Sequence, residues 1–153
     1  MRIMLALALL SAPAEAQDSP RLDAMVMDQC LAAGLAEGCI GLGARLCETA
    51  EGAMARGLCL GAETAWWQAR ADTARAVLAG REGDVQALSA RRGVPAPSLA
   101  VIEAGFAAYR DAACAWAEGQ WDGVHSGWEW AECRLHLTAG HARTLQRLVE
   151  AVE

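Results

Sequence analysis

The sequence predicts an all-α protein, a small antiparallel bundle of four to five helices cross-linked by disulfides. Alanine, leucine, arginine and glutamate are frequent and β-branched residues are few, a composition that favours helix. The alternation of apolar and polar residues that marks β-strands is nearly absent. The chain also holds six cysteines. Because much of its apolar content is alanine, which buries little surface, we expect disulfides to supplement a thin core.

Residues 1–16 have the pattern of a cleavable export signal. Arg2 precedes a short apolar run over 3–10, and an Ala-x-Ala cleavage pattern follows at 14–16. The run is shorter than the roughly 20 residues of a membrane-spanning helix, and the first cysteine, Cys30, lies too far along the chain to carry a lipid anchor. We therefore expect a single mature domain over 17–153. It would be periplasmic or secreted, without a membrane anchor, in a compartment where thiols can pair.

Start and stop signals divide the first half of this domain into helices. Asp23 suits a helix start, and Gly34 suits a helix end. The third helix is long and could be interrupted at Gly80 or Gly83. The expected ranges of the three helices are 21–33, 39–50 and 59–92, with a connection over 51–57. Of the neighbouring Trp66 and Trp67, we expect one to face the core and the other to be more exposed.

The clearest break in the chain is the segment 93–97, which holds one glycine and two prolines. Ser98 is suited to begin the next helix. Beyond it, large apolar residues recur at spacings of three and four, which predicts a buried seam along one helix face. The residues of this seam are Leu99, Ile102, Phe106, Tyr109, Ala113 and Trp116.

A glycine-rich loop is expected over 119–127, before the last helix. One side of that helix is predicted to be apolar and to contain His141, which we therefore expect to be buried and hydrogen-bonded. The residues on this side are Cys133, Leu137, His141, Leu145, Leu148 and Val152.

Six thiols allow 15 complete pairings, and spacing alone does not choose among them. The positions of the cysteines at the expected helix ends favour three bridges that each close one connection. We predict the pairs Cys30–Cys39, Cys47–Cys59 and Cys114–Cys133. A zinc site is the alternative, but such sites usually place two cysteines about two to four residues apart, and no pair here is that close. Disulfides are favoured, and we expect no metal or other cofactor.

The charge pattern narrows the choice of partner. The net charge is −6, and lysine is absent, so every fixed positive side chain is an arginine. Nucleic-acid binding needs a basic patch, which an acidic chain with scattered arginines does not provide. A cationic protein would be attracted instead, and this attraction would weaken with salt.

Four stretches of the chain, taken together, resemble the motifs of one protein family. They are Cys39-Ile40-Gly41 leading to Cys47; Cys59-Leu60-x-x-Glu63 followed by Trp66-Trp67; Phe106-Ala107-Ala108-Tyr109-Arg110-Asp111-Ala112-Ala113-Cys114; and Gln120-Trp121-x-Gly123, then Cys133 and Leu137-Thr138. The chain resembles the LprI-like lysozyme-inhibitor family of bacterial envelope proteins over most of 30–148. The third stretch is the most specific, because it fixes an Arg-Asp pair and a cysteine at one spacing.

The resemblance implies a helical, disulfide-linked envelope domain and, as an activity, the inhibition of lysozyme. Structural roles are expected for five motif residues: Glu63, Trp67, Tyr109, Arg110 and Asp111. Arg110 is expected to bond a loop carbonyl, and Asp111 a neighbouring helix. The chain departs from the family pattern over 67–75, where an aspartate, a leucine, an asparagine and a tyrosine are replaced. Phe106 replaces a tryptophan, and His141 stands where an arginine is usual.

The segment 118–130 is the candidate partner-binding loop, because it combines three tryptophans, three carboxylates and flexible glycines. Its insertion into the substrate groove of a lysozyme would use Trp121 as the aromatic anchor and Asp122, His125 or Ser126 as polar contacts. The alternative is that Trp128 and Trp130 cover the thin core.

The chain carries no enzyme signature: no Gly-x-Ser-x-Gly, P-loop, His-Glu-x-x-His or dinucleotide fingerprint. We therefore expect a binding protein and not an enzyme. A structural or accessory envelope protein with a different partner is the alternative function.

Overall fold

The structure, a computed structural model, describes residues 22–34 and 37–151. Within these ranges it is all-α, as predicted, with no strand. Its helices are α1 (Ala24–Ala32), α2 (Leu42–Glu51), α3 (Arg56–Ala79), α4 (Glu82–Arg91), α5 (Leu99–Glu118) and α6 (Val124–Glu150), with a 3₁₀ turn, η1 (Ala53–Ala55), before α3. Six helices are described instead of four to five, because the long third helix breaks at Gly80 into α3 and α4. The expected signal, 1–16, lies outside the described residues.

The helix starts follow the capping residues of the sequence. The Asp23 carboxylate accepts hydrogen bonds from two backbone N–H groups in the first turn of α1. The Ser98 hydroxyl accepts one from the Val101 N–H at the start of α5. Each side chain satisfies donors that the first helical turn leaves without an intrahelical partner.

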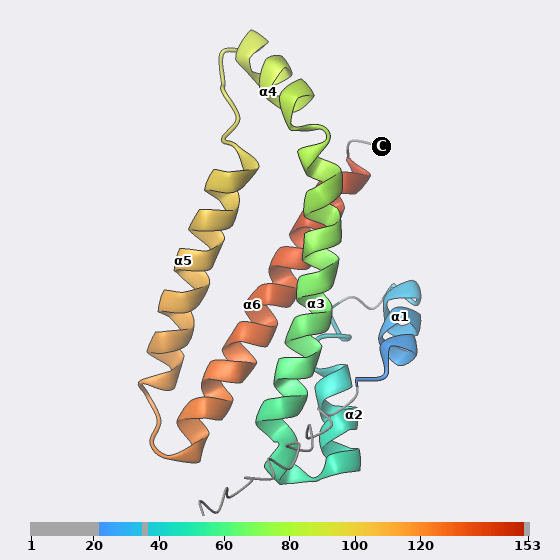
Figure 1. Cartoon of the computed structure of the whole chain (residues 1–153), viewed down its shortest axis with the longest axis vertical. Coiled ribbons are helices and arrows are strands. Elements are labelled where there is room, and N and C mark those ends of the chain that lie inside the picture. The colour runs from blue at the N-terminus through green and yellow to red at the C-terminus, as the bar shows by residue number, and fades with distance from the viewer. Residues whose placement is uncertain (1–21, 35–36, 152–153) are drawn as a thin grey trace, which may run out of the picture.

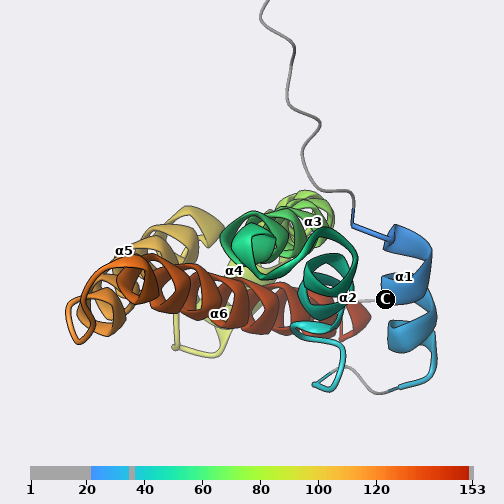
Figure 2. The same cartoon turned by 90° about the horizontal axis from the view of Figure 1, so that it is seen from below.

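The long helices α3, α5 and α6 form the body of the molecule (Figure 1). The chain rises along α3, turns through α4, descends along α5 and rises again along α6. Helix α6 packs against both α3 and α5, whereas α3 and α5 scarcely touch each other. The view from below shows α1 and α2 on the side of the molecule away from α5 (Figure 2). Helix α5 is therefore the outer helix of the other flank.

The core lies mainly between α3 and α6. Large buried side chains, such as Trp67 and Leu135, alternate there with alanines, such as Ala71 and Ala139. Alanines let the two helices approach closely but contribute little buried apolar surface each. Trp67 is fully buried and Trp66 only partly, so the expected division between the two neighbours is confirmed.

All three predicted disulfides are present, Cys30–Cys39, Cys47–Cys59 and Cys114–Cys133. The first ties α1 to the turn before α2, the second joins α2 to α3, and the third joins α5 to α6. Each bridge closes one helix connection, as the positions of the cysteines at the expected helix ends predicted.

The predicted seam of α5 is wrong at two of its three aromatic members. Tyr109 is 63% exposed and Trp116 is 76% exposed. The face that α5 turns toward α6 includes the third, Phe106, together with Arg110 and the buried Cys114. The reason is that α5 is apolar on two sides, so periodicity alone does not fix its rotation, whereas the bridge from Cys114 to α6 does.

The predicted apolar side of α6 is also partly wrong. Leu145 is buried, but Leu148 is exposed, because α6 turns a neighbouring row of residues toward α3. That row contains Leu135, Ala139 and Ala142. Val152 lies outside the described residues.

Candidate functional site

The turn between α5 and α6 is shorter than the sequence suggested. It covers 119–123, because α6 already begins at Val124. Gly123 makes the turn with φ of +61°, a conformation that glycine adopts without a steric penalty. The Ser126 hydroxyl then donates to the Gly123 carbonyl at 2.8 Å and closes the first helical turn. The predicted loop over 119–127, and the candidate binding loop up to 130, are therefore corrected: their second half is helix.

This turn gathers an aromatic cluster at one end of the bundle. The His125 ring lies between two indoles, with its centroid 5.9 Å from that of Trp121 and 5.1 Å from that of Trp128. The Arg56 guanidinium, from the start of α3, lies 5.7 Å from the Trp128 ring centroid, within cation–π range. Trp121 remains 51% exposed at the tip.

The turn between α2 and α3 reaches the same end of the molecule (Figure 1). It presents Met54, which is 91% exposed, and the exposed Leu58. Arg56 connects the two turns, because its guanidinium bonds Glu132 of α6 at 2.8 Å and lies 3.8 Å from Glu48 of α2.

We refer to the exposed and partly exposed apolar residues of these two turns, and of the helix starts that follow them, as the end surface. It consists of Met54, Leu58, Trp121, Val124 and Trp128. Asp122 and Glu118 are exposed beside it, which gives its margin a negative charge. Rigid aromatic groups beside mobile polar ones are typical of protein-binding surfaces.

The structure brings the four predicted binding residues, Trp121, Asp122, His125 and Ser126, to one turn. Their roles differ from the expectation in one respect. The Ser126 hydroxyl is used within the turn, so its proton is not offered outward. His125, by contrast, is exposed beside Trp121. Trp130 is one helical turn further along α6 and packs beneath the guanidinium of Arg134, 4.7 Å from the ring centroid.

Glu63 has a structural role, as the motif suggested, and its hydrogen bonds show that this role is to cap α2. Its carboxylate is fully buried and accepts hydrogen bonds from the Gly41 and Ala44 backbone N–H groups, both at 2.7 Å. The Trp67 indole N–H donates to the same carboxylate at 3.1 Å. A negative charge is therefore placed at the N-terminus of α2, where unpaired N–H groups and the helix dipole favour it.

The Arg-Asp pair of the third motif connects α5 to α6. The Asp111 carboxylate accepts from Arg134 of α6 at 3.1 Å, which confirms the expected bond to a neighbouring helix. Arg110 was expected to bond a loop carbonyl, but it donates to Asp111 and lies over the Phe106 ring. The reason is that the turn begins only after Glu118, more than two helical turns beyond Arg110, whereas Asp111 is its neighbour. Tyr109 points outward and is exposed.

His141 is hydrogen-bonded, as predicted, but it is partly buried and not fully buried. Its Nε2 lies 2.9 Å from a carboxylate oxygen of Glu103, and its ring stacks on Phe106 with centroids 3.8 Å apart. The second carboxylate oxygen of Glu103 lies 3.8 Å from Arg75 of α3. Side chains from α3, α5 and α6 therefore meet at one polar junction.

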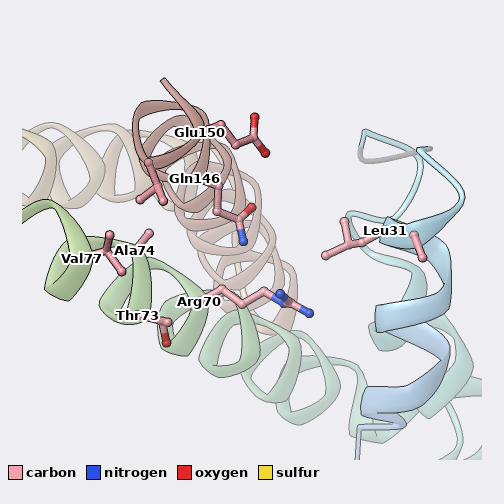
Figure 3. Close-up of a pocket in the computed structure, with 9 residues that line it drawn as sticks. Leu31, Arg70, Thr73, Ala74, Val77, Gln146 and Glu150 are labelled. Carbon is pink, nitrogen blue, oxygen red and sulfur yellow. The ribbon is translucent and has the colours of Figure 1, made fainter. Parts of the chain in front are cut away.

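A pocket lies away from the end surface, between α1 and the α3–α6 pair (Figure 3). It is open to solvent and has a volume of about 600 Å³, within the range of small-ligand sites. Arg70 projects into it from α3 toward Leu31 of α1, and Gln146 and Glu150 flank it from α6. Arg70 is already held by an ion pair with Asp28 and by stacking on Trp66, 4.2 Å from the ring centroid. Sequence reasoning did not find this pocket, because it depends on where α1 docks.

Neither a metal-binding cluster nor a membrane-spanning helix is present in the described ranges, 22–34 and 37–151. No group of three or more histidine, cysteine, aspartate or glutamate side chains in them is arranged to hold a metal ion. No helix in them is long and apolar enough to span a membrane.

Comparisons of the chain with protein-family models, with curated proteins and with solved structures each find no match. The likeness to LprI-like proteins therefore depends on the four sequence motifs alone and stays a prediction.

Proposed function

We propose that this protein is an exported, disulfide-linked helical binding protein of the bacterial envelope, and that the end surface binds a protein partner. The observation that carries the proposal is the concentration of exposed apolar side chains there, above all Trp121 and Met54. Large apolar side chains gathered on one surface of a monomer are typical of interaction sites. Tryptophan and methionine are also enriched in protein interfaces.

The end surface is rigid enough to bind without a large ordering cost. The Cys114–Cys133 bridge closes the α5–α6 hairpin, and Cys47–Cys59 closes the connection between α2 and α3. The ion pair between Arg56 and Glu132 fixes the two turns to each other. A surface held in its binding conformation loses less conformational entropy when it binds.

As the partner we propose a cationic glycosidase of the lysozyme type. The family resemblance suggests it, and the net charge of −6 and the carboxylates of Glu118 and Asp122 would steer a basic protein toward this end. The hairpin tip, and not a long loop, would enter the substrate groove. Trp121 would lie against the sugar-binding wall, and His125 would bond the catalytic carboxyls.

The decisive assay is lysis of a cell-wall suspension by lysozyme, followed as turbidity, with and without a micromolar excess of the mature, disulfide-intact protein. We expect inhibition that weakens as salt is raised, because charge steering is screened. Full lysis by every lysozyme tested at low salt would rule out this activity.

A structural or accessory role is the second candidate, and a specific observation favours it. Two residues of the segment that departs from the family pattern, Arg70 and Arg75, form ion pairs with Asp28 and Glu103. The replaced segment thus helps to dock neighbouring helices in this chain. Affinity capture from a periplasmic extract separates the candidates, since a non-lysozyme partner that is retained at high salt would favour the accessory role.

A further inference from the structure

The outward face of α5 is apolar along nearly its whole length. The exposed residues of this face recur at spacings of three and four, which places them on one side of the helix. They are Val101, Ala104, Gly105, Ala108, Tyr109, Ala112, Ala115 and Trp116. We refer to them as the α5 face. Val101 is 62% exposed, a value similar to those of the two aromatic residues.

The charged residues of α5 lie outside this face. Glu103 and Arg110 are partly buried on the side toward α6, where they bond His141 and Asp111. Asp111 and Glu118 lie along one margin. Because α5 packs on α6 and scarcely contacts α3, no other described element covers the α5 face. A helix that is apolar on two sides normally has neighbours on both.

We propose that the α5 face binds a second copy of this chain, with the two α5 helices antiparallel about a two-fold axis between Ala108 and Tyr109. The face is complementary to itself in this arrangement. Trp116 would oppose the partner's Val101, Tyr109 would oppose the partner's Ala108, and Gly105 would oppose the partner's Ala112. Each bulky side chain therefore meets a smaller one, and the symmetry makes every contact twice. The small residues beside Tyr109, which are Gly105, Ala108 and Ala112, leave room for its ring between the two helices.

Charge and area both bear on the strength of this dimer. A typical stable interface buries about 800 Å² per partner, and Trp116 and Tyr109 can each bury roughly 150–250 Å². One helix face of this size is at the lower end of that range, so we expect a dissociation constant in the micromolar range. Each copy carries a charge of −6, so salt should strengthen the dimer by screening the repulsion. Binding to a cationic partner should show the opposite dependence.

A lipid surface fits the α5 face less well. Helices that lie on membranes usually carry arginine or lysine beside their apolar face. The exposed charges beside this face are the carboxylates of Asp111 and Glu118. Binding to vesicles of anionic phospholipid in a flotation assay, with a protein that stays monomeric, would overturn the dimer.

The test is sedimentation equilibrium of the mature, disulfide-intact protein from micromolar to millimolar concentration. Ala108→Glu places a carboxylate at the two-fold axis and should raise the dissociation constant at least about 100-fold, because each dimer would bury two like charges. Ala87→Glu is the matched control: Ala87 is an exposed helical alanine on α4, and its substitution adds the same charge. It should leave the dissociation constant within about threefold.

A second variant, Trp116→Gln, should weaken the dimer in the same direction without adding charge. Trp121→Ala should leave the dimer intact, because Trp121 belongs to the end surface. The dimer and the proposed inhibition of lysozyme are therefore tested by different variants, and either can fail without the other. The proposal is overturned if the protein is monomeric at every concentration. It is also overturned if Ala108→Glu and Ala87→Glu have equal effects.

Discussion

Helix α2 packs on α3 and helix α5 packs on α6, and the two are held in different ways. The ten residues of α2 are fixed by bridges at Cys39 and Cys47, and the buried Glu63 carboxylate caps the first turn. The twenty residues of α5 are held by one bridge, and Cys114 is the one fully buried residue of that helix. The short helix is therefore fixed by polar and covalent contacts, whereas the long one is held along one side.

The difference shows where this fold leaves surface free for binding. The hydrogen bonds that the Glu63 carboxylate accepts fix the position of α2, so α2 does not need to bury a large apolar surface. Helix α5 keeps an uncovered apolar face, and the turn that follows it carries Trp121. Apolar surface available for a partner is thus left on the flank where α5 packs on α6 alone, and at the turn that follows α5.

Among the substitutions proposed for comparing α2 with α5, Glu63→Ala should cause the largest loss of stability. The substitution leaves two backbone N–H groups and the Trp67 indole N–H without their acceptor in a buried site. Each unsatisfied donor is costly, so we expect a loss of about 4 kcal/mol in the free energy of unfolding. Chemical denaturation of the purified protein, followed by circular dichroism, measures it.

Glu51→Ala provides the control, because Glu51 is an exposed glutamate of α2. It should change the free energy of unfolding by less than about 0.5 kcal/mol. Equal and small losses for the two variants would show that the buried carboxylate does not fix α2.

Replacing both Cys114 and Cys133 by serine should be the next largest change. The bridge closes a sequence separation of 19 residues, and its removal should reduce stability by roughly 3 kcal/mol on the chain-entropy account. Amide hydrogen exchange should then rise first in α5, which has no other covalent link to α6. Faster exchange in α2 than in α5 would contradict the assignment of α5 as the more weakly held helix.

The disulfides, α1, α2 and α5 could be predicted from the sequence because their signals are local. Each cysteine pair flanks one connection, and Asp23 and Ser98 precede the helices that they cap. The rotation of α5 could not be predicted, because residues on both of its sides are apolar. Tyr109 and Trp116 fit the helical period, yet the bridge at Cys114 turns them outward.

The sequence predicted which residues of the α5–α6 turn belong to the candidate site, but not the backbone conformation that holds them. Trp121, Asp122, His125 and Ser126 were expected to act together, and they lie at one turn. The glycines suggested a long loop, but Gly127 is tolerated inside α6. The contribution of Met54 from the other turn, and the cap that Glu63 gives α2, depend on residues far apart in the chain, so no local pattern indicates them.

Trp121→Ala should separate binding from stability. Loss of a central aromatic anchor typically weakens binding by about 2 kcal/mol or more, which is roughly 30-fold in the inhibition constant. The side chain is half exposed, so the free energy of unfolding should change by less than about 1 kcal/mol. Trp116→Ala is the matched control on the α5 face and should leave inhibition unchanged. If the two variants inhibit equally well, the end surface is not the binding site.

Arg134→Gln should have the smallest effect on stability, although it breaks the ion pair between Arg134 of α6 and the motif residue Asp111 of α5. Both side chains are partly exposed, so the pair should contribute less than about 1 kcal/mol to stability. The substitution also removes the stacking of the guanidinium on Trp130, which should shift the tryptophan emission. A loss comparable to that of the Cys114–Cys133 bridge would mean that α5 is held by polar contacts as firmly as α2, and the contrast between the two helices would disappear.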